Sequence, residues 1–471
     1  MDLQGVLDKL SLFLKGEDCH PEPMVTADDI RARVADVLPG VHRDLEDLVR
    51  IQSVSADPKR VSEVRRCAEA VAELFRAQDC DAVDIVSVDG GLPAVIARKG
   101  GPDGAPTVLL YAHHDVQPEN GHADWESPPF EPTARDGRLY GRGAADDKAG
   151  IAAHLSTLRV YGDKLPVSVI VFVEGEEEIG SPTLATLLES YRRMLEADVI
   201  VITDSTNWDI GVPALTTSLR GLVRLDVEVR TLTHAVHSGG WGGLVPDALV
   251  AMSRVIASLH DDRGNVAVRG LRSGPAADIL VPEERLRAAS GAVPGLEWIG
   301  DGSPVERLWT RPALSITGLD APRVEGASNT LVPVARARIS LRIAPTDTID
   351  NAVACLIRHL EDHVPWGATL THTLLDTGEP AWMDAVGPVY EAARVALTDA
   401  WEGTPPVDMG VGGSIPFIAE FRQAFPGATV LVTGVEDPGT RAHGANEGLH
   451  LAEFERAVLA QALLLKHLGD L

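Results

Sequence analysis

Two adjacent carboxylates, Asp146 and Asp147, stand at the end of a glycine-bent loop, directly before an apolar run with helical character. A site for two metal ions needs a carboxylate that can face both ions across about 3.5–4 Å, and Asp146 is a candidate for that bridge. Taken alone, an Asp-Asp pair is more often an acidic turn with solvated side chains. A phosphate-binding loop is a third interpretation, but Lys148 has no glycine immediately before it and no Ser or Thr after it, so the P-loop pattern is absent.

Imidazole and carboxylate side chains, the ligands that divalent transition metals prefer, gather in four other short segments. His113 or His114 would suit a metal ligand steadied by Asp115, although a lone histidine is more often an ordinary, partly buried side chain. The three successive acids at 176–178 are harder to explain, because like charges repel unless a cation offsets them; one could bind metal and another hold a proton. The segment at His443 has an alternative interpretation as a helix-entry loop. The four segments are Ala112-His-His-Asp115, Glu174-Gly-Glu-Glu-Glu-Ile-Gly180, Thr203-Asp204 and Ala442-His-Gly-Ala-Asn-Glu447.

Each cluster follows a predicted buried strand. Apolar runs alternate with helical runs over the first 200 residues, which predicts an α/β sheet. In open α/β sheets, sites gather outside the carboxyl ends of the strands, so four separate placements agree. We therefore hypothesise that the five segments form one dinuclear metal site that hydrolyses an amide bond. The predicted strands are 107–112, 167–173, 198–202 and 428–433, and the helical runs between them include 151–160 and 182–195.

The hydrophobic pattern of the sequence changes near Thr217, where runs begin in which apolar and polar residues alternate, as they do in half-exposed strands. Two such runs, 221–230 and 334–342, are each followed by a helical run, which predicts an α+β unit inserted into the first domain. We expect a catalytic domain from 1–216 and 381–471, interrupted by a smaller domain at 217–380. Residues 279–320 are rich in Gly, Pro and charge, and the sequence assigns them no element.

The composition narrows the class of protein. A chain of 471 residues suggests two domains, and 42 basic against 69 acidic residues leave a formal charge of −27. That charge disfavours nucleic acid and anionic membranes as partners. No secretory signal and no apolar run near the roughly 20 residues of a membrane span is present, so a cytoplasmic protein is expected. The four cysteines have no metal-binding spacing and are expected to be reduced.

Five motifs, in this order along the chain, resemble those of a dinuclear metallopeptidase family. That family includes carnosinases and bacterial dipeptidases, aminoacylases, succinyl-diaminopimelate desuccinylase, acetylornithine deacetylase and glutamate carboxypeptidase. The resemblance implies a metal-binding α/β/α sheet domain interrupted by a smaller α+β (ferredoxin-like) lid/dimerisation domain, and a homodimer. The motifs are Tyr-Ala-His-His-Asp-Val-Gln-Pro118, Tyr-Gly-Arg-Gly-Ala-Ala-Asp-Asp-Lys148, Glu-Gly-Glu-Glu-Glu-Ile-Gly-Ser181, His-Ser-Gly-Gly-Trp-Gly-Gly243 and Ala-His-Gly-Ala-Asn-Glu447.

The resemblance also implies a role for each matching residue. His113 and Asp204 would hold one divalent ion, Glu178 and His443 the other, and Asp146 would bridge them through a loop whose Asp146–Asp147 peptide is typically cis. Glu177 would be the general base and Asp115 would orient His113. His237 would enter the site from the second domain, often of a dimer partner, and stabilise the oxyanion. Thr330, Arg342 and Ser414 resemble substrate-binding positions, whereas Ala149 stands where the family usually has glycine.

The resemblance favours the carnosinase-like dipeptidase branch, because the position of Asp204 is usually aspartate in the dipeptidases and glutamate in the deacylases. The Asn207-Trp208 that follows also resembles the carnosinase-like branch. The implied reaction is attack by a metal-bridging hydroxide on the amide of a dipeptide, with Glu177 taking the proton from water. Zn²⁺ is the first choice of metal, with Mn²⁺ or Co²⁺ as alternatives. An N-acyl-amino-acid deacylase that uses the same site is the alternative enzyme. A catalytically silent binding protein is a third hypothesis, which is disfavoured because a pure binding protein has no use for an unliganded acid such as Glu177 beside the metals.

Overall fold

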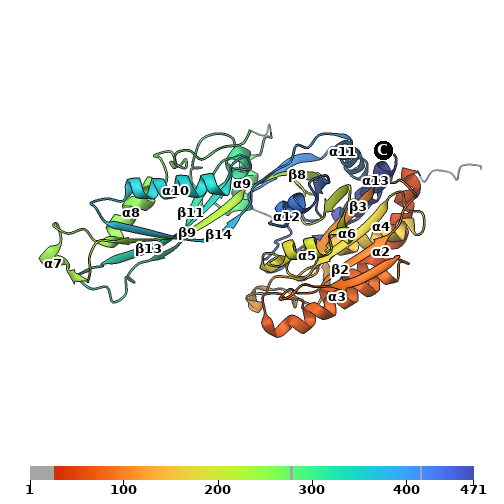
Figure 1. Ribbon diagram of the computed structural model, residues 1–471, viewed down its shortest axis with the longest axis horizontal. Coiled ribbons are helices and arrows are strands. Elements are labelled where there is room, and N and C mark those ends of the chain that lie inside the picture. Colours follow the sequence, from red (N-terminus) through yellow and green to blue (C-terminus); the bar gives the residue numbers. More distant parts are fainter. Residues whose placement is uncertain (1–25, 276–278, 414–415) are drawn as a thin grey trace, which may run out of the picture.

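The structure, a computed structural model, describes residues 26–275, 279–413 and 416–471. Figure 1 shows an elongated molecule in which a larger α/β domain and a smaller α+β domain lie end to end. The smaller domain is formed by the middle of the chain, and the larger one by the parts before and after it. This arrangement has the mixed α/β character that the sequence predicts.

A six-stranded sheet forms the centre of the α/β domain, in the order β1-β2-β6-β3-β7-β17. The four strands β6, β3, β7 and β17 are parallel neighbours, whereas β1 and β2 pair in antiparallel fashion at one edge. The carboxyl ends of those four parallel strands therefore meet at one edge of the sheet. The strands are β1 (Ala82–Val86), β2 (Ala94–Lys99), β3 (Thr107–His113), β6 (Ser168–Glu174), β7 (Val199–Ile202) and β17 (Thr429–Val432).

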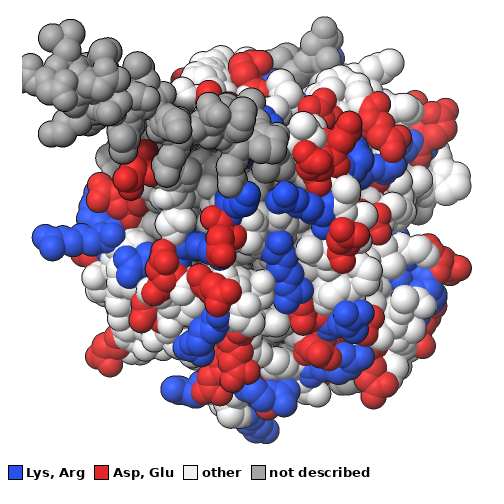
Figure 2. Space-filling view, turned by 90° about the vertical axis from the view of Figure 1, so that its right-hand side faces the viewer, with Lys and Arg blue, Asp and Glu red and all other residues white. Residues whose placement is uncertain are grey.

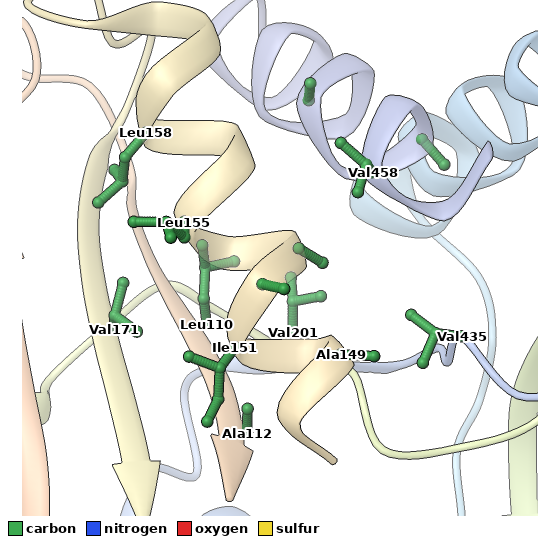
Figure 3. Packing of buried hydrophobic residues seen from close by; sticks show 14 of the residues in the cluster. Leu110, Ala112, Ala149, Ile151, Leu155, Leu158, Val171, Val201, Val435 and Val458 are labelled. Atoms are coloured by element: carbon green, nitrogen blue, oxygen red, sulfur yellow. The ribbon is translucent and has the colours of Figure 1, made fainter. Parts of the chain in front are cut away.

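Helices cover both faces of this sheet. Figure 3 shows α4 lying along the sheet, with Leu155 and Ile151 packed near Leu110 and Val171 in one buried cluster. Ala149, on the first turn of α4, is fully buried in the same cluster, so its methyl group is accommodated by the core. One face of the sheet is covered by α2 (Ala27–Val49), α3 (Val61–Arg76), α4 (Lys148–Tyr161), α11 (Pro388–Ala400) and α13 (Leu451–Gly469). The other face is covered by α5 (Leu184–Ser190), α6 (Arg192–Leu195) and α12 (Pro416–Ala424).

The α+β domain contains a four-stranded antiparallel sheet in the order β11-β13-β9-β14. With a helix after the first and the third of these strands in chain order, this is the predicted ferredoxin-like arrangement. Side chains of β9 alternate between buried and half-buried, and the buried face packs under the two helices, as the alternating sequence predicts. The elements are β9 (Gly221–Arg230), α8 (Ala248–Ser258), β11 (Ala313–Asp320), β13 (Val334–Ile343), α10 (Ile349–His363) and β14 (Thr369–Gly378).

Three small sheets complete the fold. The sheet β15-β8-β16 lies where the two domains join, and β8 continues through Arg220 directly into β9. The pair β10 and β12 lies at the far end of the α+β domain, beside the short helix α7 (Figure 1). The strands are β15 (Ala381–Trp382), β8 (Ala214–Leu219), β16 (Val407–Val411), β10 (Val236–His237), β12 (Thr330–Leu331), β18 (Gly448–His450), β5 (Arg138–Tyr140) and β4 (Thr133–Arg135); α7 spans Ser238–Trp241.

Several predicted boundaries differ from the structure. Helix α2, for which the sequence analysis gave no bounds, begins at Ala27 because Thr26 and Asp29 form a capping box, and Pro39 is accommodated inside the helix. The single helix predicted over 182–195 is two short helices that meet at Tyr191. Residues 279–320, which the sequence left unassigned, contain α9 (Glu283–Ser290), a π-helical turn (Glu306–Thr310) and β11.

The end of the α/β domain carries mixed charge on its surface, and the described cysteines are free. Figure 2 shows the end of the α/β domain, where acidic and basic side chains are interspersed rather than gathered into one basic face. Cys67, Cys80 and Cys355 are free, whereas Cys19 lies outside the described residues. Among the described helices, none is both long and apolar enough to cross a bilayer.

Candidate metal centre

Asp146 lies at the centre of the site, and its two carboxylate oxygens face two different histidines. Oδ1 is 3.1 Å from Nε2 of His113, and Oδ2 is 3.0 Å from Nε2 of His443. The next residue, Asp147, caps α4 by accepting a hydrogen bond from the backbone N–H of Gly150. The peptide bond between Asp146 and Asp147 is cis. The loop that was predicted to supply a bridging carboxylate therefore presents each oxygen to a separate imidazole.

The other predicted ligands surround Asp146 in two pairs. His443 Nε2 lies 3.2 Å from Glu178 Oε2, and His113 Nε2 lies 3.8 Å from Asp204 Oδ2. Glu177 Oε2 lies on the same side, 3.9 Å from His113 Nε2. Two sets of potential ligand atoms, each within 4.8 Å of one another, result: His113, Asp146 and Glu178, and His113, Glu177 and Asp204. Segments far apart in the sequence thus converge as the strand topology predicts.

Asp115 is fully buried and joins the two segments that carry the first histidine and the glutamates. Its Oδ1 is 3.5 Å from His113 Nδ1, and its backbone carbonyl is 3.0 Å from the same nitrogen. The carboxylate also accepts hydrogen bonds from the backbone N–H groups of Glu177 and Glu178, each at 3.1 Å. Asp115 can therefore orient the His113 ring and fix the glutamate turn at the same time.

The three successive acids of the glutamate turn have different surroundings. The carboxylate of Glu176 accepts hydrogen bonds from the backbone N–H groups of Leu92 (3.0 Å) and Thr183 (2.7 Å), so it is bound into the fold. Glu178 accepts from the side-chain amide of Gln117 at 2.7 Å and faces His443. The sequence showed the cluster but could not say which acid was structural, because that depends on loops that pack from elsewhere.

The pair Arg142 and Glu447 supports Asp146 from behind and was not predicted. Both are buried, with Nη1 of Arg142 2.6 Å from Oε2 of Glu447. Glu447 also accepts hydrogen bonds from the backbone N–H groups of Gly143 (3.1 Å), Ala145 (3.0 Å) and Asp146 (3.2 Å). This carboxylate therefore shapes the loop that presents Asp146. Its proximity to His443 in sequence was the only available signal.

Replacing Arg142 by Met should reduce the free energy of unfolding by about 3–5 kcal/mol, because it leaves the buried Glu447 carboxylate without its cation. Chemical denaturation would measure the loss. Arg66, which is exposed and pairs with Glu63 on the surface of α3, provides the matched control. Arg66→Met should change stability by no more than about 1 kcal/mol; an equal loss in both variants would contradict a supporting role for Arg142.

Lys148 is fully buried, and its side chain reaches the end of α2. Its ammonium donates to the backbone carbonyls of Leu48 (2.9 Å) and Ile51 (2.7 Å), at the C-terminal end of α2. It therefore satisfies acceptors that a helix end leaves open. The phosphate-binding interpretation of this loop is wrong, since its lysine is committed to the fold.

The electrostatics of the site indicate that positive charge is needed. Burial raises the pKa of Asp204 to about 7, and the charge of Asp146 adds to the effect although His113 opposes it. Burial also raises the pKa of Glu177 well above its usual range, with the charge of Asp204 contributing. Hydrogen bonds to Asp146 and Glu178 raise the pKa of His443 to about 11. Divalent cations would offset this crowding of carboxylates, and two imidazoles with three carboxylates fit Zn²⁺, Mn²⁺ or Co²⁺.

Two of the predicted residues of the α+β domain, His237 and Thr330, lie far from the site of their own chain. His237 and Thr330 are exposed and lie opposite one another in the β10–β12 pair, at the end of the molecule far from the α/β domain (Figure 1). Arg342 lies at the other end of β13, opposite Leu222 of β9. The eight residue steps from Val334 to Arg342 span roughly 26 Å at about 3.3 Å per residue. Ser414, the remaining predicted substrate residue, lies outside the described residues.

The fold and the site together define a class: an α/β metallohydrolase in which the predicted ligands for two ions converge at the carboxyl edge of a parallel sheet. The chain belongs to peptidase family M20/M25/M40, whose sequence profile matches residues 109–467. The predicted family resemblance is therefore confirmed.

Individual relatives agree in length as well as in sequence. The chain is 32% identical over 439 residues to a cysteinylglycine-S-conjugate dipeptidase of Corynebacterium striatum, covering 91% of this chain and 95% of that protein. It is 28% identical over 475 residues to the beta-Ala-His dipeptidase of Homo sapiens, covering 95% and 89%. The solved structure of human carnosine dipeptidase 1 superposes with a TM-score of 0.78 at 24% identity, covering 96% of this chain and all of that one, 100%. This last likeness establishes the fold.

Proposed function

We propose that this protein is a metal-dependent dipeptidase that hydrolyses the amide bond of dipeptides or short peptides. The observation that supports it best is the arrangement around Asp146, whose two oxygens face His113 and His443 at 3.1 and 3.0 Å. In this proposal His113 and Asp204 would hold one ion, Glu178 and His443 would hold the other, and Asp146 would contribute a carboxylate oxygen to each. When bound, the two ions would supply Lewis acidity and lower the pKa of water.

Glu177 is the proposed general base. Its carboxylate lies beside the ligand atoms, and a raised pKa suits a group that must hold a proton between two steps. It would accept a proton from the attacking water at its carboxylate and later give it to the leaving amine. Asp115 would keep the Glu177 backbone and the His113 ring in their positions during both proton transfers.

Both free ends of a dipeptide have a candidate partner in this proposal. Arg342 offers a forked guanidinium for a carboxylate, a geometry that favours substrates with a free acid end. The acidic surroundings of Asp204 suit a free amino end. The names of the two relatives described above, both dipeptidases, support this choice over the deacylase alternative, in which the same centre would accept an acylated amine.

We predict that chelation abolishes hydrolysis and that Zn²⁺, Mn²⁺ or Co²⁺, added back singly, restores it. We expect Zn²⁺ to restore it best.

With the restored enzyme, dipeptides should be cleaved faster than their N-acetyl counterparts, since an acylated amine loses the positive charge that the acidic site favours. A panel of matched pairs, followed by release of free amino acid, measures the preference. Faster cleavage of the acylated compounds would replace the dipeptidase proposal by the deacylase.

A homodimer is part of the proposal. His237 and Thr330 lie at the far end of the α+β domain, roughly 26 Å or more from Arg342 along β13, so one dipeptide cannot contact all three in a single chain. A second chain would bring its His237 to the first chain's site. We also propose a cytoplasmic location, which the free thiols of Cys67, Cys80 and Cys355 support.

A further inference from the structure

Arg220 is a buried arginine at the junction of the two domains, between β8 and β9. Only 8% of its surface is exposed. Its Nε donates to the backbone carbonyl of Gly412 (3.3 Å), and its Nη1 donates to the carbonyl of Arg307 (3.2 Å). Arg220 thus contacts the glycine loop that leads into Ser414. It has no predicted role.

No acid balances this charge. Among the described residues, neither Arg220 nor Arg342 has a carboxylate oxygen within 4.0 Å of its guanidinium. The acid that acts on Arg342, Asp376, is held by two hydrogen bonds from Arg224, at 2.6 and 2.7 Å. The register of β9 and β13 brings the two arginines close together along the backbone, because Gly221, which follows Arg220, lies opposite Ile343, which follows Arg342. Burial and the charge of Arg342 together lower the pKa of Arg220 to about 10. Two cations therefore share this region without an anion, which is unfavourable in a buried setting unless an anion binds there.

Gly412 keeps space open at the Arg220 guanidinium. A Cβ atom at this position would lie 2.7 Å from Nη2 of Arg220, closer than real contacts allow. Its backbone is not in the left-handed region, so the need for glycine here is one of space. The next residue, Gly413, would meet no atom within 4 Å.

The segment that the sequence left unassigned holds Arg220 in place. Its π-helical turn supplies the Arg307 carbonyl, and Trp309 in the same turn packs edge-on against Trp208, with ring centres 5.8 Å apart. Arg285 from α9 stacks over the Trp208 ring, with its guanidinium carbon 4.4 Å from the ring centre, and pairs with Asp209 at 3.0 Å. These contacts tie the Arg220 region to the loop that follows Asp204.

We infer that Arg220 and Arg342 together form a two-arginine subsite for the free carboxylate of the substrate, with Arg220 as a specificity-determining residue. This rests on the proposed dipeptidase function. A carboxylate has two oxygens that can each accept from a guanidinium, so both cations can be balanced by one substrate end. The Arg307 carbonyl fixes the direction from which Arg220 approaches.

The test compares alanylalanine with alanylalanine amide in the metal-loaded wild type and in Arg220→Gln. The variant should lower the acid-to-amide ratio of kcat/KM by about 10–100-fold, mainly through KM for the acid, because a hydrogen bond to a charged group is lost. Arg220→Lys should recover part of the ratio. An equal fall for both substrates would show that Arg220 is structural and overturn the inference.

Two further measurements protect the test from a folding defect. Gly412→Ala leaves Arg220 present but displaces its guanidinium, so it should lower the same ratio, whereas Gly413→Ala should keep it. Calorimetric titration of the metal-loaded Glu177→Gln protein with both compounds measures binding without cleavage. Tighter binding of the acid, lost on adding Arg220→Gln, supports the subsite even if wild type hydrolyses no dipeptide, an outcome that would refute only the proposed function. Equal binding of acid and amide would refute the subsite.

Discussion

Replacing Glu177 by Gln should lower kcat by about 10³-fold while two metal ions per chain stay bound, because a general base contributes roughly 10²–10⁴-fold and Gln cannot accept the proton. The physical reason is position: the Glu177 carboxylate lies 3.9 Å from His113 Nε2, close to the predicted ligand atoms. Atomic emission of the dialysed protein gives the metal content, and initial rates on a dipeptide give kcat.

Glu178→Gln provides the comparison for this experiment. Glu178 lies 3.2 Å from His443 Nε2, so its loss should remove an ion as well as activity. The grouping of Glu177 with His113 and Asp204 allows a different outcome, in which Glu177 itself holds metal. If Glu177→Gln also loses an ion, Glu177 is a ligand and the general base must be sought elsewhere. Full activity in the variant would remove it from the mechanism.

The convergence of the site could be predicted because it follows from strand order alone. His113 ends β3 and Asp204 follows β7, and these parallel neighbours deliver both residues to the same edge of the sheet. The type of each strand was readable from its unbroken apolar run. The roles of Glu177 and Glu178 came from the resemblance, because adjacent identical side chains carry no signal of their own about which one faces a metal.

The supporting contacts could not be predicted because they join residues that are distant in sequence and unremarkable in type. Arg142 and Glu447 are 305 residues apart, and their pairing depends on how the last loop packs against the loop of Asp146. The sequence also gives no signal for Arg220, because its hydrogen-bond partners are backbone carbonyls, which every residue type has. The segment 279–320 lacked a periodic pattern because α9 has no buried residues and the π-helical turn is too short to show one.

The position of His237 gives the prediction that separates a dimeric site from a monomeric one. His237→Ala should lower kcat by about 10²–10³-fold, the usual effect of losing one oxyanion donor. Its Nδ1 accepts a hydrogen bond from the backbone N–H of Gly239 at 3.0 Å, so the neutral ring carries its proton on Nε2, which is free to donate. Because His237 lies at the far end of its own chain (Figure 1), that donor should serve a second chain.

Mixing His237→Ala with Glu177→Gln therefore should restore activity that neither variant has alone. In a mixed dimer, the Glu177→Gln chain contributes an intact His237 to the site whose Glu177 is intact, so one of two sites works. Random exchange of subunits makes half of the dimers mixed, which predicts about a quarter of wild-type activity per chain. Refolding or prolonged incubation of the two variants together, with each variant mixed with itself as the control, measures this recovery. If no activity returns although sedimentation shows that mixed dimers have formed, or if a monomer is fully active, His237 does not act across an interface, since only a donor supplied by the partner can repair a site whose own chain lacks it.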